Sequence, residues 1–483
     1  MNWTEEYLWT FLLAAVNVVI ASAATVHAVL YKRETRSVIG WVGLVWLSPL
    51  FGSLLYFCFG INRLERKAIT MRLQSDWQHP RQALLIDQDI AQQNELIAKH
   101  PPLAELAGLV TRLTEHPLFP GNDVQPLCDG DEAYPAMLEA IDRAERSVTL
   151  LSYIFDNDRA GEAFLESLVR AHQRGVQVRV LIDDVGARYS RPTMLRRLRQ
   201  AGVNARAFLP TRVPRMFKYA NLRNHRKILV VDGRIGFTGG TNIREGHWLS
   251  LRPAAPVRCL HFRFEGPVVA HLQEVFGMDW AFVANELLEG DTWFPKLQRA
   301  GGVWARGVSD GPDEDIDKMP LTILGALTAA RRSVHVVTPY FLPDSSIMHA
   351  LSVAALRGVA VHIVLPAKNN IPLVQWATAA VLPEIMARGC QVHLNPPPFD
   401  HTKLLLIDDL WALVGSTNWD ARSLRLNFEF NVECYSPDLT SRLRGFVDQR
   451  IADSQTLTLP QLLDRPLLSR LRDGAARLMS PYL

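Results

Sequence analysis

The chain has 483 residues, of which 48% are hydrophobic, and a formal net charge of +3. This length exceeds that of one ordinary domain, and the composition excludes a disordered or fibrous protein. The small net charge does not support nucleic acid as the partner, because affinity for nucleic acid rests on many cationic contacts with phosphate.

Two long apolar runs open the chain, from about Tyr7 to Leu30 and from about Val38 to Ile61. Each is long enough to cross a bilayer as a helix, which takes roughly 20 residues. A cleaved signal peptide is the competing interpretation of the first run, but the start of the chain has Glu5 and Glu6 and no Lys or Arg. We therefore expect a transmembrane helical hairpin over residues 1–62.

Basic residues flank the second run on both sides, so the positive-inside rule favours opposite orientations about equally. These residues are Lys32, Arg33, Arg36, Arg63, Arg66, Lys67 and Arg72. The sequence leaves open which membrane face the remaining chain occupies.

Beyond the hairpin, residues 63–125 mix charged residues, Gln and Leu, and we expect a helical connector there. From about residue 131, helical and strand patterns alternate: residues 134–146 are typical of a helix, and residues 147–155 of a buried strand. Such alternation predicts an α/β fold with a sheet that is covered on both faces.

The same pattern recurs later in the chain. Four stretches match in the same order at offsets of 176 to 186 residues: 137–148 with 323–334, 153–155 with 339–341, 174–181 with 357–364, and 225–232 with 401–408. We predict two homologous halves, over residues 126–300 and 301–483, that pack against each other.

The last of these matches is a His-x-Lys-x4-Asp motif in each half. Its residues are His225, Lys227 and Asp232 in the first half, and His401, Lys403 and Asp408 in the second. A His and a Lys two positions apart lie on one face of an extended chain. This pairing suits a phosphodiester, because an imidazole nitrogen can attack phosphorus while cations stabilise the added negative charge. A single such pair is usually surface charge, but two copies within repeated halves favour a functional site.

Further polar residues follow each motif. Asn242 comes after Gly239-Gly240-Thr241, and Asn418 after Gly415-Ser416-Thr417; an amide at this position can donate to a phosphate oxygen.

Two carboxylates come later in the halves, Glu265 and Glu429. A carboxylate that accepts a hydrogen bond from the Nδ1–H of a histidine fixes the tautomer and leaves Nε2 free to react. Because Glu265 lies 33 residues after its Asp and Glu429 only 21, one of the two is open to interpretation as an ordinary charged residue.

With these motifs the chain resembles the phospholipase D superfamily and, within it, the bacterial cardiolipin synthases with two N-terminal transmembrane helices. The stretches that carry the resemblance are 152–155, 181–188, 224–233, 338–344 and 478–483. Gly240 stands where the superfamily often has Ser, as Ser416 does in the second half.

The resemblance implies two phospholipase D-type sandwich halves and a multi-pass protein of the bacterial inner membrane. It implies that one histidine forms a phosphatidyl-histidine, while the other protonates the departing alcohol and then deprotonates the acceptor. In a cardiolipin synthase, phosphatidylglycerol is both donor and acceptor, and glycerol is released. No metal or other cofactor is required. Family analogy favours His225 as the nucleophile.

Three other interpretations remain: a hydrolytic phospholipase D, in which water is the acceptor; a nuclease; and a non-catalytic lipid-binding protein. The hairpin and the low net charge count against nucleic acid, and the two intact motifs count against the last. The sequence says nothing of the oligomeric state or of other acceptors.

Two basic segments also contain apolar residues. Residues 210–223 lead into the first motif and alternate Arg and Lys with aromatic residues, which suits either an anionic lipid surface or a solvated loop. Residues 462–483 combine four Arg with Leu and Met at helical spacing, and either lie in a membrane interface or cap the fold. The five cysteines are an odd number and are well separated in the sequence, so we interpret them as buried apolar side chains.

Overall fold

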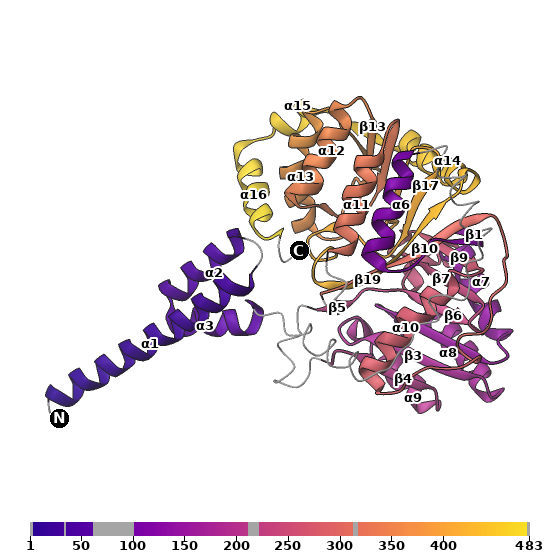
Figure 1. Ribbon diagram of the computed structural model, residues 1–483, viewed down its shortest axis with the longest axis horizontal. Helices are drawn as coiled ribbons and strands as arrows, with labels where there is room; N and C mark the ends of the chain where they lie inside the picture. The colour runs from indigo at the N-terminus through magenta and orange to yellow at the C-terminus, as the bar shows by residue number, and fades with distance from the viewer. Residues whose placement is uncertain (1–2, 33–34, 61–100, 211–221, 313–316, 481–483) are drawn as a thin grey trace. The chain divides into compact units, whose positions relative to one another are not determined.

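The computed structural model describes residues 3–32, 35–60, 101–210, 222–312 and 317–480 (Figure 1). The described residues fall into two units: residues 3–32 and 35–60 form the first, and residues 101–210, 222–312 and 317–480 form the second. Most of the predicted connector and the basic segment before the first motif lie outside the described residues.

The first unit consists of apolar helices: α1 (Trp3–Tyr31), α2 (Thr35–Leu47), α3 (Pro49–Leu55) and the π-helical turn η1 (Tyr56–Gly60). Among the described residues, only the stretch Trp9–Tyr31 of α1 is long and apolar enough to cross a membrane. Its apolar side chains are largely exposed, with Phe11 at 72% and Val19 at 66%. Such exposure is typical of a helix that faces lipid and not of a buried core helix.

The second apolar run does not form a second spanning helix. Pro49 interrupts it, because proline lacks an N–H group and disfavours helical backbone at the preceding residue. Trp46 Nε1 donates to Thr25 Oγ1 at 3.0 Å, and the Tyr56 hydroxyl lies 2.8 Å from His27 Nδ1. A continuous helix from Trp46 to Tyr56 would span about 15 Å, whereas their partners are two residues apart on α1. The chain therefore turns back at Pro49, and the expectation of two spanning helices is corrected to one.

The second unit contains α6 (Pro101–Thr114) and both predicted halves. The first half comprises β1 (Phe119–Cys128), α7 (Asp129–Asp142), β2 (Ser147–Ser152), α8 (Arg159–Gln173), β3 (Gln177–Asp183), η2 (Gly186–Arg188), α9 (Met194–Gln200), β4 (Asn204–Phe208), β5 (Arg223–Asn224), β6 (Ile228–Val231), β7 (Ile235–Gly239), η4 (Glu245–His247), η5 (Leu249–Leu251), β8 (Val257–Arg258), β9 (Leu260–Glu265) and α10 (Val269–Ala284). The second comprises β10 (Val303–Asp310), α11 (Lys318–Ala329), β11 (Ser333–Val337), β12 (Phe341–Leu342), α12 (Ser345–Leu356), β13 (Ala360–Pro366), α13 (Pro372–Met386), β14 (Gln391–Asn395), β15 (Phe399–Asp400), β16 (Leu404–Ile407), β17 (Trp411–Gly415), β18 (Trp419–Asp420), β19 (Asn427–Tyr435), α14 (Pro437–Asp453), β20 (Gln455–Leu457), α15 (Leu459–Leu463) and α16 (Leu467–Leu478).

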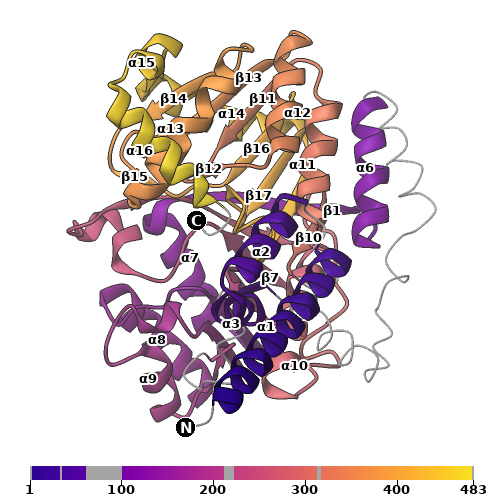
Figure 2. The ribbon, with the colours of Figure 1, turned by 90° about the vertical axis from the view of Figure 1, so that its left-hand side faces the viewer.

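One long sheet runs through both halves, in the order β4-β3-β2-β6-β7-β9-β1-β10-β19-β17-β16-β11-β13-β14-β20. Read inward from β4 or from β14, the two half-sheets have the same order, so that β6 corresponds to β16, β7 to β17 and β9 to β19. They meet where β1 pairs antiparallel with β10, at the centre of the sheet (Figure 2). The prediction of an α/β fold with two homologous halves is confirmed.

Helices cover both faces of each half-sheet, as the alternation of side chains along a strand requires. In β2, Val148 and Leu150 belong to the core formed with α7 and α8. Thr149 between them points to the opposite face, where its hydroxyl donates to Gln273 of α10 at 3.0 Å. The strands that carry the two motifs are thereby buried on both faces, which fixes the residues at their ends.

Helix α6, which lies within the predicted connector, packs against α11 as part of the second half. Its Leu106 and Val110 share a core with Ile323. Arg306 of β10, which is fully buried, donates to the Ala107 carbonyl of α6 at 3.0 Å and pairs with Glu433 of β19 through its Nε at 2.7 Å. A buried guanidinium needs such partners, so α6 is a structural part of the fold and not only a spacer.

The repeated stretches of sequence mark the ends of helices. Asp158 and Asp344 are the N-caps of α8 and α12, and each side chain accepts the backbone N–H three residues later, at 2.9 and 3.0 Å. Arg174 donates to carbonyl groups at and just beyond the C-terminus of α7. Arg357 donates in the same way at the C-terminus of α11. The repeat thus preserves the residues that end and begin these helices in both halves.

The aspartates of the two motifs have a structural role that the sequence analysis did not anticipate. Asp232 follows β6, and its carboxylate accepts the backbone N–H groups of residues 145, 146 and 147 at 2.7 to 3.0 Å. Asp408 follows β16 and accepts those of residues 331, 332 and 333 at 2.7 to 3.1 Å. Each lies beyond the end of its strand that is remote from the histidine. We therefore correct the expectation that these aspartates belong to the catalytic cluster. Each instead holds the loop that joins a helix to the following strand, α7 to β2 for Asp232 and α11 to β11 for Asp408.

We predict that Asp408→Asn lowers the free energy of unfolding by about 2 kcal/mol, because a charged acceptor of three backbone N–H groups is lost. The neighbouring Asp409→Asn is the matched control, since Asp409 forms an ion pair with Arg332 in which both side chains are more than 60% exposed. It should cost less than about 0.5 kcal/mol. Denaturant unfolding of the full-length protein in detergent measures both, and equal values for the two variants would contradict the anchoring role.

Candidate active site

The two histidines come from opposite halves and lie together. Each precedes a buried strand, His225 before β6 and His401 before β16, and their ring centroids are 6.4 Å apart. The backbone N–H of His225 donates to Phe428 of the second half at 2.9 Å, and that of His401 donates to Arg258 of the first half at 2.8 Å. The short strand before each histidine pairs with the opposite half as well, β5 with β19 and β15 with β8. Each histidine is thus held by the backbone of the other half.

The two lysines lie beside the histidines, as their spacing predicts. Lys227 Nζ donates to the His225 carbonyl at 2.6 Å, and Lys403 Nζ donates to the His401 carbonyl at 2.7 Å. Both side chains are buried. Burial lowers the pKa of Lys227 to about 7 and that of Lys403 to about 8, because it disfavours the charged form. Burial of two ammonium groups is unfavourable unless a negative charge lies nearby, so this arrangement favours the binding of an anion.

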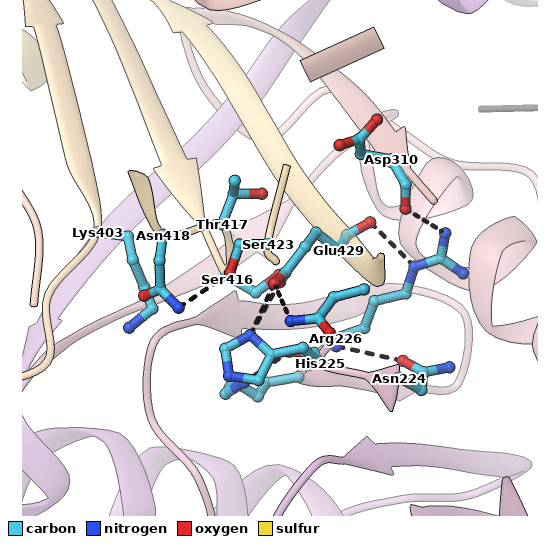
Figure 3. A network of polar contacts seen from close by, with 12 residues as sticks. Asn224, His225, Arg226, Asp310, Lys403, Ser416, Thr417, Asn418, Ser423 and Glu429 are labelled. Carbon is cyan, nitrogen blue, oxygen red and sulfur yellow. Dashed lines mark hydrogen bonds and ion pairs between the residues drawn. The ribbon is translucent and has the colours of Figure 1, made fainter. Parts of the chain in front are cut away.

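Glu429 of β19 orients His225 (Figure 3). The Nδ1 of His225 lies 2.9 Å from one carboxylate oxygen of Glu429 and 3.0 Å from the other. Ser416 donates to the same carboxylate at 2.5 Å. A carboxylate accepts only, so the ring carries its proton on Nδ1 and presents the lone pair of Nε2.

The charges at this pair follow from burial and from the neighbours. Burial lowers the pKa of His225 to about 4, against the opposing effect of Glu429. Burial alone would raise the pKa of Glu429, but His225 and Lys227 together with the hydrogen bonds outweigh it, and the pKa is lowered. At neutral pH the pair is a neutral imidazole that donates to an ionised carboxylate.

His401 has a different partner. Its Nδ1 lies 2.9 Å from the backbone carbonyl oxygen of Gly240, in the first half. A carbonyl also accepts only, so His401 too carries its proton on Nδ1 and exposes Nε2. Burial, with Lys403 as the next contribution, lowers the pKa of His401 well below its ordinary value.

The sheet register explains the difference between the two histidines. Gly239 pairs with His261 in the first half, and Gly415 pairs with Asn431 in the second. Two residues before each partner stand Cys259 and Glu429, so Cys259 takes the place of a carboxylate in the first half. Its thiol donates to the His401 carbonyl at 3.4 Å, and burial raises its pKa to about 12.

Gly240 lies against Cys259 in the first half, at the positions where Ser416 contacts Glu429 in the second. A Cβ at position 240 would lie 2.5 Å from Cys259 Sγ and 2.7 Å from the His401 carbonyl oxygen. A serine has no room there without a shift of the backbone that carries His401. The first half therefore differs from the second at two positions that contact each other: Gly240 replaces the serine, and Cys259 replaces the glutamate.

The expectation that Glu265 orients a histidine is wrong. Glu265 lies at the end of β9, opposite Asp123 and Ile235, and forms an ion pair with Arg263 at 2.5 Å. Its side chain is 36% exposed, unlike the fully buried Glu429. Of the two carboxylates that the sequence suggested, only Glu429 reaches a histidine.

The two asparagines are buried, each three residues beyond the last residue of β7 or β17. Asn242 Oδ1 accepts the N–H of Ile154 at 3.2 Å, and Asn418 Nδ2 donates to Ser423 at 3.1 Å. Their contact with a phosphate stays a prediction.

Three residues beside the histidines were not anticipated. Tyr153 lies with its ring 5.0 Å from that of His225, and Tyr340 lies 6.3 Å from His401. Both tyrosines occur in the repeated stretches 153–155 and 339–341, which was a usable signal. His247 of η4 lies 6.1 Å from His401, and its buried Nδ1 has no hydrogen-bond partner among the described residues. The 176-residue offset between the motifs places Ser423 at the equivalent position, so the repeat gave no hint of this third histidine.

Comparison with known proteins agrees with this geometry. A family model described as "Cardiolipin synthase, PLD-like domain" matches residues 137–280 and 323–451. The cardiolipin synthase of Geobacillus thermodenitrificans is 30% identical over 99% of this chain and 96% of its own length. Cardiolipin synthase 1 of Staphylococcus epidermidis is 31% identical over 94% of this chain and 93% of its own.

Among solved structures, the phosphatidylserine synthase of Haemophilus influenzae shares the fold, with a TM-score of 0.63 and 15% identity. The match covers 78% of this chain and all of that one. Two matched regions, each with its own histidine motif, and relatives that span nearly the whole chain show that the protein belongs to the cardiolipin synthase family of phospholipase D-like proteins.

Proposed function

We propose that this protein is a cardiolipin synthase, which transfers a phosphatidyl group from one phosphatidylglycerol to a second and releases glycerol. The observation that carries the proposal is the pair of buried histidines, 6.4 Å apart, whose Nδ1 atoms are both engaged. Each ring therefore presents Nε2 for reaction. The cardiolipin synthases that match the chain along nearly its full length support the choice of substrate.

In the first step, His225 Nε2 attacks the phosphorus of a bound phosphatidylglycerol. The bond from phosphorus to the headgroup oxygen breaks, and protonated His401 donates its Nε2 proton to that oxygen. Glycerol leaves as a neutral alcohol, and the phosphatidyl group remains on His225. The negative charge of the bound phosphodiester favours the protonated form of His401, against the burial and the lysines that disfavour it. Lys227 and Lys403 stabilise the charge that develops on the phosphoryl oxygens.

In the second step, the neutral His401 takes the proton from a headgroup hydroxyl of a second phosphatidylglycerol. The hydroxyl oxygen attacks phosphorus, the bond from phosphorus to His225 breaks, and cardiolipin forms. His401 is then protonated again for the next cycle, so no proton is gained or lost overall.

His225 suits the role of nucleophile because of its partner. A histidine bonded to phosphorus gains positive charge, and the ionised carboxylate of Glu429 stabilises that charge at 2.9 Å. His401 has only the partial charge of a carbonyl for the same purpose. Its weaker partner suits a group that must release its proton readily.

A lipid substrate agrees with an anchor in the membrane. We propose that α1 holds the protein in the bacterial inner membrane, with the α2–α3 hairpin embedded beside it. The contacts Trp46–Thr25 and Tyr56–His27 support this packing.

The direct test is to incubate the purified protein in detergent with labelled phosphatidylglycerol and to separate the products. Cardiolipin and glycerol in equal amounts support the proposal, and His225→Ala and His401→Ala should both lack turnover. Phosphatidic acid as the only lipid product would indicate hydrolysis instead. Unchanged phosphatidylglycerol would exclude both reactions.

Glu429→Gln should lower kcat by a factor on the order of 10²–10⁴, because the neutral amide no longer stabilises the charged phosphatidyl-histidine. The matched control is Glu265→Gln, which alters a carboxylate at the end of β9 that is 36% exposed and pairs with Arg263. Its kcat should stay within about twofold of the wild-type value. If both variants keep wild-type turnover, Glu429 has no part in catalysis.

The apparent KM for phosphatidylglycerol should rise with pH. Burial lowers the pKa of Lys227 to about 7 and that of Lys403 to about 8 in the free protein, so both ammonium groups lose their protons between about pH 7 and pH 9. An anionic substrate binds the form in which both lysines are protonated, and the rise in KM from pH 7 to pH 8 should be about tenfold. A KM that is constant to pH 9 would show that the charge of these lysines does not govern binding.

A further inference from the structure

The C-terminal helix α16 turns its apolar side chains outward. Leu467 is 68% exposed, Leu468 81%, Leu471 59% and Leu478 79%. The helix instead buries Ala476, at 3% exposure, and Asp473, at 2%. The Asp473 carboxylate forms ion pairs with Arg465 at 2.6 Å and with neighbouring Arg472 at 2.9 Å. A helix of a water-soluble surface has the opposite arrangement, with its apolar stripe toward the core.

The outward leucines form one stripe. With about 100° of rotation per residue, Leu467, Leu471 and Leu478 fall within about 40° of one another, and Leu468 lies at the side of the stripe. Arg470 and Arg477, both exposed, follow one edge of it, and Arg472 lies near the other. The guanidinium of Arg472 also lies over the ring of Trp376 in α13, at 4.5 Å, which ties this edge to the fold.

We propose that α16 lies on the surface of a bilayer that contains anionic phospholipids, with the leucine stripe inserted among the acyl chains. Arg470 and Arg477 at one edge of the stripe are then at the level of the lipid phosphates, where cationic side chains with long apolar stems are stable. A helix of 12 residues is about 18 Å long, which is typical of a helix that lies in the interface and too short to cross it.

Two observations favour a bilayer over another occupant. Arg470 and Arg477 give one edge of the stripe a positive charge, which complements anionic lipid and would oppose a second copy of the same surface. The same chain carries α1, which is long and apolar enough to span a membrane and so keeps the catalytic unit near one. Of the two interpretations that the sequence left open for residues 462–483, docking in the interface is the one that explains the outward stripe.

Limited trypsin digestion tests the docking without relying on catalysis. The full-length protein is placed in vesicles of phosphatidylcholine, with or without phosphatidic acid, which has no headgroup alcohol to transfer. We expect cleavage after Arg470 and Arg477 to be at least about tenfold slower in the anionic vesicles than in detergent. Cleavage after Arg143, whose side chain is 79% exposed, serves as the reference in the same molecules. Equal relative cleavage in vesicles and detergent would overturn the proposal.

A triple variant tests the consequence for turnover and rests on the proposed function. Leu467→Gln, Leu471→Gln and Leu478→Gln together should slow reaction of phosphatidylglycerol in vesicles by at least about tenfold. Reaction of a short-chain phosphatidylglycerol, dissolved as monomers, should not change. The matched control combines Leu321→Gln, Val353→Gln and Leu356→Gln, which alter exposed apolar residues of α11 and α12.

Each other outcome has a distinct meaning. An equal loss with both substrates would mean that the leucines only maintain the fold, and no loss with either would mean that they do not dock; both overturn the proposal. A smaller particle mass for the triple variant in light scattering would identify the stripe as an interface between copies, which also overturns it. If the wild-type protein makes no cardiolipin, the proposed function fails while the trypsin result still decides the docking.

Discussion

The site depends on two hydrogen bonds that cross from one half of the protein to the other. His225 of the first half is oriented by Glu429 of the second at 2.9 Å, and His401 of the second by the Gly240 carbonyl of the first at 2.9 Å. Neither half alone provides an oriented histidine. The long sheet makes this exchange possible, because β1 and β10 pair at its centre and bring β9 and β19, with their partner residues, to the middle of the molecule.

The halves are alike in fold but unequal in chemistry. The position that holds the ionised Glu429 in one half holds a thiol, Cys259, in the other, with a pKa that burial raises to about 12. Gly240 is part of this change, because its Cβ would collide with Cys259 and with the backbone of His401. The site therefore has two neutral imidazoles and two lysines, and of the two histidines His225 has an ionised carboxylate as its hydrogen-bond partner whereas His401 has a backbone carbonyl. This arrangement distinguishes the two histidines, which the symmetry of the motifs did not.

The repeated motifs were enough to predict the two halves and the pairing of His225 with His401, because four ordered matches have few explanations other than duplication. The orienting carboxylate was harder to predict. Glu265 and Glu429 look alike in the sequence, and only the register between neighbouring strands shows that Cys259 is the true counterpart of Glu429. Asp232 is similar: its role depends on a loop 85 to 87 residues earlier in the chain. The turn at Pro49 was visible in the sequence, but the hydrophobicity of the whole run obscured it.

The central claim is that His225 carries the phosphatidyl group and His401 moves the proton. A donor lipid with p-nitrophenol in place of glycerol tests it, because p-nitrophenolate leaves without needing a proton from His401. Mixed with this donor, the His401→Ala protein should release one equivalent of p-nitrophenolate in a burst and retain the labelled phosphatidyl group. Digestion at alkaline pH, which preserves phosphohistidine, should then place the label on the peptide that contains His225, while His225→Ala gives no burst. A burst from His225→Ala, or label on the peptide with His401, would contradict the account.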